Sequence, residues 1–419
     1  MVLLILKGYI IFTVFVMTVY AARHYRFTWN RLLGRQRLYY QDILDSDLPP
    51  LTVLVPMHDE ERVVRQSLDA LLRCEYPRHL LEIIPIDDHS TDGTGAILDE
   101  YAARHAEVRP LRRREGKRGK PAALNDALAI ARGEVIVVFD ADYVPNRGAL
   151  REIAICFNDP EVGAVMGRVV PYNTKRNLLT RLLDLERSGG YQVDQQARHN
   201  LRLMPQYGGT VGGFRRAQAL ALGGFDPRVL AEDTDLTLRL YLRGYKVAYA
   251  NRLECFEEVP ENWTVRSRQV RRWARGHNLV MFRFFGPLLR SPFLSRTEKF
   301  DGALLLLIYL VPVVLFLGIA DSVALFYLGE MQILESALIF LFVAAYSSFG
   351  NFAPFYEIGT AALIDGVNYR LRLLPFMTFY FLLNVLTTTV GFFQALGDYA
   401  LRRDVGWAKT ERFGNAEKR

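Results

Sequence analysis

The stretch VIVVFDAD at residues 135–142 decides the fold, because five apolar residues run directly into two acids separated by one alanine. Its apolar part, Val135–Phe139, is rich in β-branched side chains, which predicts a short buried strand. Two similar runs, Leu51–Pro56 and Leu81–Ile86, lie upstream, and each also ends in polar residues. Three buried strands that stop at polar side chains predict a sheet with chemistry at one edge.

Helical patterns separate these strands, at Glu60–Cys74, Gly93–His105 and Pro121–Arg132. Alternating strands and helices predict an α/β fold with a parallel sheet and right-handed crossovers. Ligands of such sheets bind outside the carboxyl ends of the strands. The polar residues at 58–60, 87–88 and 140–142 are therefore expected to meet on one rim.

Composition divides the chain into a soluble α/β part and apolar ends. Half of the 419 residues are hydrophobic, yet residues 302–350 and 373–397 are almost free of charge, unlike residues 51–300. The net charge of +7 does not indicate nucleic-acid binding, because the arginines form no basic stripe with interleaved aromatic residues. Three cysteines without metal-like spacing argue against a disulfide framework and for a reduced compartment.

Residues 2–22 form an apolar run long enough to cross a bilayer as one helix. A cleavable secretory signal is the alternative, with a candidate cleavage site at residues 19–21. Positive charges begin at Arg23, after the run, and only Lys7 lies within it. This asymmetry favours a retained anchor at residues 1–24, an outside N-terminus and a cytosolic domain at residues 45–260.

A C-terminal membrane region is expected at residues 301–400, with candidate spans at Gly302–Leu328, Gln332–Gly350 and Leu373–Leu396. Phe352–Val367 contains two acids, so it is expected to lie at the interface or to re-enter the membrane. Three simple crossings would place the basic tail at residues 401–419 outside, against its charge. The number of crossings stays open at this point.

Asp140 and Asp142 are the first candidate ligand site. Carboxylates at alternate positions beyond a strand end hold a hard divalent cation that also contacts two phosphate oxygens. The alternative for an isolated pair of this kind is a solvated turn.

Asp87 and Asp88 form a second candidate site, in an acidic turn that leads into a helix. Asp88 is suited to accept hydrogen bonds from a pyrimidine N–H and a ribose hydroxyl. Helix capping accounts for Asp92 but not for two adjacent acids at a strand end. The basic run at residues 112–120 ends in Lys120, a candidate pyrophosphate contact, although a solvated charge run is the alternative.

Glu232 and Asp233 open a helical pattern at Thr234–Arg243, shortly after a glycine-rich stretch at residues 208–216. The glycines permit close approach to a ligand, but their spacing fits neither a Walker motif nor a dinucleotide fingerprint. Acids at a helix start commonly cap the helix. A carboxylate there also serves as a general base for an attacking sugar hydroxyl.

The fourth motif is Gln269-Val-Arg-Arg272-Trp273, in an arginine-rich amphipathic segment at residues 261–300. An interfacial helix on an anionic leaflet explains its composition. Trp273 additionally offers a flat face for a sugar ring, with Gln269 one turn earlier on the same helix face.

In their order along the chain, which is Asp87-Asp88, Asp140–Asp142, Glu232-Asp233 and Gln269–Trp273, the four motifs resemble a family-2 glycosyltransferase, most of all the membrane-embedded processive branch of cellulose, chitin, hyaluronan and poly-N-acetylglucosamine synthases. The resemblance covers roughly residues 50–285 and the flanking apolar segments. It implies a GT-A fold, an α/β Rossmann-like domain beside transmembrane helices. It also implies that Asp88 contacts uracil, that Asp59 and Glu60 line the nucleotide pocket, and that Asp140 and Asp142 hold Mg²⁺ or Mn²⁺ against the UDP diphosphate.

The same resemblance implies that Asp233 is the catalytic base, next to Glu232, and that Lys120 contacts the donor. Gln269, Arg272 and Trp273 would bind the diphosphate and the acceptor terminus. The tail residues Trp407, Thr410 and Arg412 resemble a gating loop that closes over UDP, which requires a cytosolic C-terminus. Two departures are the Ala231 that opens the acidic motif and the absence of a PilZ-type regulatory domain after the tail.

The leading hypothesis is an inverting UDP-sugar hexosyltransferase that polymerises a β-linked polysaccharide and passes it through the plasma membrane. Its donor would be UDP-glucose or UDP-N-acetylglucosamine, its acceptor the growing glycan, and its partners lipids and possible accessory export subunits. The alternative is a non-processive enzyme that makes a glycolipid of the glucosylceramide or glucosyl-diacylglycerol type. A catalytically dead scaffold is disfavoured because the carboxylates and Trp273 are intact.

Overall fold

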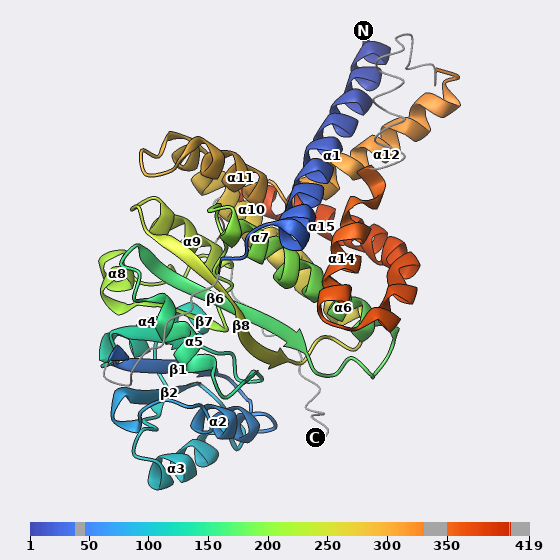
Figure 1. Cartoon of the computed structure of the whole chain (residues 1–419). Helices are drawn as coiled ribbons and strands as arrows, with labels where there is room; N and C mark the ends of the chain where they lie inside the picture. Colours follow the sequence, from blue (N-terminus) through green and yellow to red (C-terminus); the bar gives the residue numbers. More distant parts are fainter. Residues whose placement is uncertain (38–46, 331–349, 402, 404–419) are drawn as a thin grey trace.

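The computed structural model describes residues 1–37, 47–330, 350–401 and 403. Its centre is an eight-stranded sheet in the order β3-β2-β1-β4-β7-β6-β8-β5 (Figure 1). The strands are β1 (Leu51–Met57), β2 (Leu81–Asp88), β3 (Leu111–Arg113), β4 (Val135–Val138), β5 (Val144–Pro145), β6 (Val162–Pro171), β7 (Gly212–Arg215) and β8 (Lys246–Glu257).

The three strands expected from sequence are present and pair in parallel. Strand β1 lies between β2 and β4, with Leu51 opposite both Leu81 and Val135. This register brings Met57 opposite Asp87, so the polar residues that follow β1 and β2 share one edge. The expected rim is therefore confirmed.

The other half of the sheet is mixed, which corrects the expectation of a parallel sheet throughout. Strand β7 runs antiparallel to both β4 and β6. It fits there because it begins with Gly212 and Gly213: a Cβ on Gly212 would lie 2.1 Å from the Val165 carbonyl oxygen, and one on Gly213 would lie 2.6 Å from that of Ile136. The glycine-rich stretch thus serves strand packing as well as the site.

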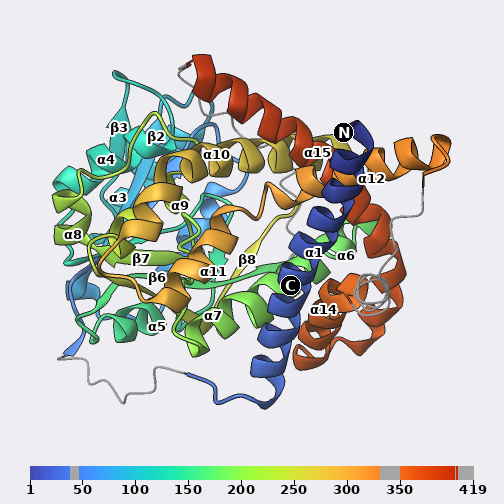
Figure 2. The same ribbon diagram turned by 90° about the horizontal axis from the view of Figure 1, so that it is seen from above.

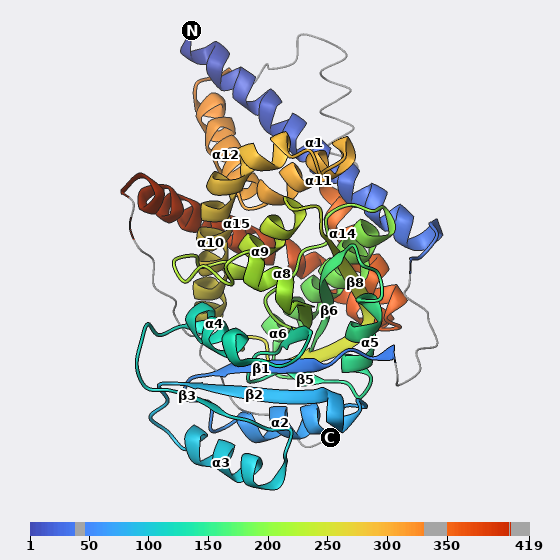
Figure 3. The same cartoon turned by 90° about the vertical axis from the view of Figure 1, so that its left-hand side faces the viewer.

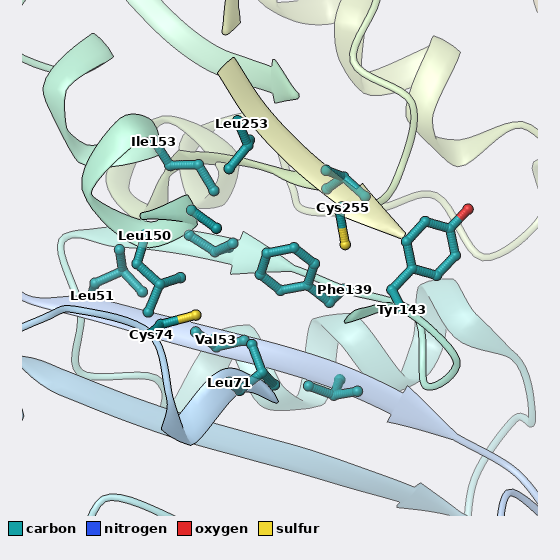
Figure 4. Packing of buried hydrophobic residues seen from close by; sticks show 14 of the residues in the cluster. Leu51, Val53, Leu71, Cys74, Phe139, Tyr143, Leu150, Ile153, Leu253 and Cys255 are labelled. Atoms are coloured by element: carbon teal, nitrogen blue, oxygen red, sulfur yellow. The ribbon is translucent and has the colours of Figure 1, made fainter. Parts of the chain in front are cut away.

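Helices cover both faces of the sheet (Figure 3). On one face α2 (Val64–Leu72), α3 (Thr94–Arg104) and α5 (Ala149–Cys156) enclose a core that includes Val53, Leu71 and Ile153 (Figure 4). On the other face α4 (Lys120–Ile130), α8 (Arg216–Ala221), α9 (Glu232–Tyr241) and α10 (Trp263–Arg290) enclose a second core. All three cysteines are buried thiols, as the absence of a disulfide framework predicts.

Two described helices are long and apolar enough to cross a membrane. They are α1 (Val2–Leu33) and the stretch Asn368–Leu401, which contains η5 (Asn368–Leu373) and α15 (Leu374–Leu401). Helix α1 extends from the sheet together with α12 (Val311–Tyr327), and the N-terminus lies at the far end (Figure 1). Helix α15 packs along α10 (Figure 2).

The single span expected at Gly302–Leu328 is instead two helices, α11 (Arg296–Leu306) and α12, bent by 61°. The break falls just before Pro312, because proline lacks an N–H and its ring clashes with the carbonyl of the preceding turn. The expected span Gln332–Gly350 falls, except for Gly350, outside the described residues.

The acids in Phe352–Val367 contact protein groups. This segment forms α14 (Ala353–Ile364), where Glu357 lies 2.5 Å from His24 of α1 and is buried. Asp365 accepts a hydrogen bond from Arg168 at 2.7 Å. Helix α6 (Leu178–Ser188), the π-helix η3 (Gly189–Gln195) and α7 (Gln196–Asn200) connect this bundle to the sheet.

Candidate active site

A cavity of about 1210 Å³ extends from the carboxyl ends of β1, β2 and β4 to the terminal helices. Most of the residues predicted from sequence line it, namely Glu60, Asp88, Lys120, Asp140, Glu232, Asp233, Gln269, Arg272 and Trp273. Asp59, Asp87 and Asp142 lie beside the lining residues but not among them. Trp407, Thr410 and Arg412 lie outside the described residues. The fold thus brings together residues from four separate motifs.

Asp87 is fully buried and holds the basic strand β3 in place. Its Oδ2 accepts hydrogen bonds from Arg112 and Arg114, both at 2.8 Å. Burial alone would raise the pKa of Asp87, but hydrogen bonds from Arg114, Ser90 and Arg112 hold it below its usual value. Its predicted contact with a substrate stays a prediction, since these partners already occupy it.

Asp88 ties the end of β2 to the start of α4. Its carboxylate pairs with Arg113 and accepts the backbone N–H of Gly119 at 2.8 Å. Gly119 has φ of +119°, a conformation that side chains with a Cβ rarely adopt. Since α4 begins at the next residue, Asp88 and Gly119 fix where Lys120 enters the cavity.

Asp59 and Glu60 shape the turn after β1. Asp59 has φ of +52°, and its Oδ1 accepts the Thr91 backbone N–H at 2.7 Å. The backbone N–H of Glu60 donates to Thr94 Oγ1 at 2.8 Å. These bonds join the turn after β1 to the turn after β2. Glu60 lines the cavity, and Asp59 holds the two turns together beside it.

Lys120 is the cation at the centre of the acidic end of the cavity. Its Nζ lies 2.7 Å from Asp140 Oδ1 and 3.9 Å from Glu232 Oε1. Burial opposes its charge, but Asp140 and Glu232 raise the pKa of Lys120 above its usual value, so it is an ammonium ion here. The basic run expected from sequence ends where α4 begins, which explains the fixed position of Lys120.

The two adjacent acids of the third motif lie at the start of α9, where Glu232 is buried and Asp233 is half-buried. Burial raises the pKa of Glu232 to about 7, Lys120 opposes the shift and the neighbouring Asp233 adds to it. The pKa of Asp233 is also raised, mainly by burial, although the Thr234 backbone N–H donates to its Oδ1 at 2.6 Å. A carboxylate with a raised pKa is a better general base than an ordinary aspartate.

Gly209 explains part of the glycine-rich stretch before these acids. It has φ of +74°, and a Cβ there would lie 3.1 Å from the Cβ of Asp233. The close approach is therefore to the catalytic candidate itself, whereas sequence analysis expected an approach to ligand. The next residue is Thr210, whose hydroxyl accepts the Asp140 backbone N–H at 3.0 Å and so joins the glycine-rich stretch to the Asp140–Asp142 turn.

Asp140 and Asp142 fit a divalent cation that is held partly by substrate. Among the described residues no group of three or more His, Cys, Asp or Glu side chains forms a metal cage. Mg²⁺ is usually bound through one or two carboxylates together with substrate phosphates, which matches a two-carboxylate site facing a donor cavity. Asp142 is buried and Asp140 lines the cavity.

Trp273 carries arginines over its ring where sequence analysis predicted an open stacking face. The guanidinium carbons of Arg187 and Arg266 lie 5.3 and 5.1 Å from the ring centroid, within cation–π distance. Arg266 also donates to Gln269 Oε1 at 2.8 Å and to Glu186 Oε2 at 2.6 Å. A sugar that stacks on Trp273 therefore has to share the ring with a cation.

Sequence analysis missed a relay of hydrogen bonds that joins the Asp140–Asp142 turn to Trp273 of the fourth motif. The Tyr143 hydroxyl, one residue after Asp142, donates to Glu257 Oε2 at 2.7 Å, and Arg187 Nε donates to Glu257 Oε1 at 2.6 Å. Tyr143 stands at the edge of the apolar cluster with its hydroxyl pointing away from it (Figure 4). Tyr143 could have been predicted from its position directly after the two acids. Glu257 and Arg187 lie in no sequence pattern that would have indicated their role.

Paired acids at the strand ends of an α/β sheet, a half-buried lysine and two adjacent carboxylates at a helix start are the arrangement of a sugar-transferring enzyme of the GT-A fold. The family model described as "Glycosyltransferase like family 2" matches residues 49–276, and the chain belongs to that family. It is therefore a glycosyltransferase.

Two curated relatives are similar over the same region. The chain is 36% identical over 248 residues to "Probable glycosyltransferase YdaM" of Bacillus subtilis (strain 168), covering 58% of this chain and 59% of the relative. It is 32% identical over 276 residues to "Beta-monoglucosyldiacylglycerol synthase" of Nostoc sp. (strain PCC 7120 / SAG 25.82 / UTEX 2576), covering 65% and 58%. The chain thus spans about three fifths of the length of these relatives.

One solved structure shares the fold over most of the chain. It is "Mannosyltransferase PcManGT from Pyrobaculum calidifontis in complex with GDP-Man and Mn2+". The TM-score is 0.57 at 22% identity, covering 90% of this chain and 99% of that one. This similarity supports the GT-A fold.

Proposed function

We propose that this protein transfers a hexose from a nucleoside-diphosphate sugar to the hydroxyl group of a membrane lipid, which makes a glycolipid. The observation that carries this proposal is the continuous cavity. One part is lined by charged groups that include Lys120, Asp140 and Asp233, and another by apolar side chains of the terminal helices, such as Leu305, Phe381 and Val385. A water-soluble donor and a lipid acceptor would meet within it.

The chemistry would be a single displacement with inversion. Asp233 takes the proton of the acceptor hydroxyl, which attacks the anomeric carbon while the bond to the diphosphate breaks. Asp140 and Asp142 would hold Mg²⁺ or Mn²⁺, which neutralises charge on the departing diphosphate. Lys120 and Arg272 line the same part of the cavity and add fixed positive charge for that leaving group.

A lipid acceptor accounts for the cavity better than the polysaccharide that sequence analysis placed first. The helix end of this cavity has aliphatic side chains and phenylalanines that suit acyl chains, and polar side chains beside them that suit a lipid headgroup. The relative named as a glucosyldiacylglycerol synthase, at 32% identity, supports the same choice. We place the enzyme in the plasma membrane with its sheet domain on the cytosolic side.

The test uses the purified full chain in nanodiscs with Mg²⁺ or Mn²⁺ and a diacylglycerol acceptor. Radiolabelled UDP-glucose, UDP-N-acetylglucosamine and GDP-mannose are supplied one at a time, and the product is sized. Label in a solvent-extractable glycolipid from one donor is the expected result. Label confined to high-molecular-weight polymer would overturn the proposal in favour of a polysaccharide synthase.

A further inference from the structure

A chain of polar side chains leaves the catalytic carboxylates and runs along the cavity. Thr234, whose backbone N–H donates to Asp233, accepts a hydrogen bond from Gln206 Nε2 at 2.6 Å on its hydroxyl. The Gln206 backbone N–H donates to Gln195 Oε1 at 3.1 Å, and Gln195 Nε2 donates back to the Gln206 carbonyl at 3.2 Å. Gln195 and Gln206 both line the cavity, so polar contacts continue beyond the transfer site.

This polar chain leads into η3, a seven-residue π-helix. The wide turn is uncommon in proteins and occurs frequently at functional sites. Gly190, Tyr191, Asp194 and Gln195 of η3 all line the cavity. A Cβ placed on Gly190 would meet nothing within 4 Å, so the cavity is open at that residue.

Two ion-paired clusters continue the polar lining to α1. Asp194 accepts hydrogen bonds from Arg23 at 3.0 Å and from Arg198 at 2.5 Å, and both arginines also bind Asp301. Next to Arg23 in sequence, His24 Nδ1 lies 2.5 Å from Glu357 of α14. Asp194, Arg198, His24 and Glu357 line the cavity, although none belongs to the four sequence motifs.

We propose that this stretch, from Gln195 to the His24–Glu357 pair, is the headgroup subsite for an uncharged, hydroxyl-bearing lipid of the diacylglycerol class. The inference rests on the proposed function and names its acceptor. The lipid's free hydroxyl lies toward Asp233, its ester oxygens meet the polar groups of the subsite, and its chains lie among the apolar helix residues. Phe355, Phe381 and Leu382 line the same cavity and provide that apolar contact.

The hydrogen-bonding capacity of the subsite fits ester and hydroxyl oxygens. His24 uses Nδ1 for Glu357, and among the described residues no group is bonded to its Nε2. Gln195 Nε2 has a second N–H besides the one that it donates to Gln206. The Gln195 amide is therefore a donor on a cavity-lining residue, and His24 Nε2 also donates when the imidazole is protonated and forms an ion pair with Glu357.

The charges of the subsite argue against a phosphorylated acceptor. Each of the two guanidinium groups already contacts two carboxylates, Asp194 and Asp301. Glu357 adds a third carboxylate beside His24. A lipid phosphate placed here would lie beside carboxylates, and the two arginines already form ion pairs with those carboxylates. The phosphate would then be a buried anion without a cationic partner, which is costly in free energy.

The experiment measures initial rates in nanodiscs against the mole fraction of diacylglycerol, with the donor that the assay above identifies. His24→Ala and Gln195→Ala should each raise the acceptor KM about tenfold, which is the effect of losing one hydrogen bond to a buried ligand group. Neither variant should change the donor KM by more than about twofold. Gly190→Leu should do the same by filling the open space, and it retains the helix because leucine favours helix more than glycine. Thr18→Ala, on α1 but outside the cavity, is the matched control.

Phosphatidylglycerol with the same acyl chains carries free hydroxyls as well as a phosphate, so it tests the charge argument and should not be glycosylated. Equal use of phosphatidylglycerol, or variants that change the donor KM and leave the acceptor KM unaltered, would overturn the subsite. If the proposed function itself is wrong, neither the wild-type protein nor any variant will label a lipid, which distinguishes that outcome from failure of the subsite. Unfolding temperature and nucleoside-diphosphate binding of each variant show that a loss is not misfolding.

Discussion

The Lys120 ammonium lies 2.7 Å from Asp140, the first carboxylate of the acidic pair that follows β4. This ion pair places one positive charge at the end of the cavity where a divalent cation and the donor diphosphate are expected to bind. Lys120 therefore balances the acidic end of the cavity before substrate arrives, and afterwards it is available to the phosphate oxygens.

Removing this ammonium should have two opposite effects. Lys120→Ala leaves Asp140 and Glu232 without their nearby cation, so Mn²⁺ should bind more tightly to the nucleotide-free protein. The same change removes a phosphate contact, so the donor KM should rise about tenfold or more. Calorimetric Mn²⁺ titration and donor kinetics separate the two effects. Weaker Mn²⁺ binding together with an unaltered donor KM would contradict this role.

Asp233→Asn should lower the transfer rate by about 100- to 10,000-fold, the usual contribution of a general base. Binding of the nucleoside diphosphate should persist, because the amide keeps the shape of the side chain. Asp99→Asn, at an exposed position on α3, is the matched control. Appreciable turnover by Asp233→Asn would assign the base to another group.

The acid pair at the start of α9 predicts a pH dependence near neutrality. Glu232 has a pKa raised to about 7, mainly by burial and further by Asp233, so its ionised form is lost as the pH falls below about 7. If transfer needs both acids ionised, kcat/KM should fall on the acid side of that value. Glu232→Gln removes a neighbouring negative charge and should move the acid limb to lower pH. A pH profile that keeps its limb near 7 in this variant would exclude Glu232 as the titrating group.

The relay through Glu257 predicts a link between the metal site and Trp273. Tyr143→Phe deletes the hydrogen bond to Glu257 and should destabilise the protein by about 1 kcal/mol. Glu257→Gln leaves Arg187 without its carboxylate and should cost more, although the partial exposure of Arg187 limits the loss. Denaturant unfolding measures both. Changed Mn²⁺ affinity in Glu257→Gln, far from any Mn²⁺ ligand in sequence, would show that the relay positions the turn.

Strand and rim positions were predictable because short-range patterns determine them. Each of the three parallel strands is a β-branched run that ends at acids, and parallel pairing then puts those acids on one edge. The same holds for Lys120 and Asp233, which begin helices beside that edge.

Other features depend on contacts that no local pattern encodes. Asp87 and Asp88 are adjacent, yet successive strand residues point to opposite faces, so one meets Arg112 and Arg114 and the other lines the cavity. The arginines over Trp273 come from α6 and from about two turns earlier in α10, and the first of these is distant in sequence. The antiparallel strand β7 likewise depends on how closely glycines approach β6.

The cavity that joins charged strand ends to apolar helices has a kinetic consequence. If the acceptor is a membrane lipid, as we propose, the donor concentration is set per volume of water and the acceptor concentration per area of bilayer. Turnover should therefore follow the surface density of acceptor, so that added inert lipid slows the enzyme even when the total amounts of protein and acceptor are unchanged. The rate of transfer would therefore depend on the lipid composition of the membrane, because other lipids dilute the acceptor.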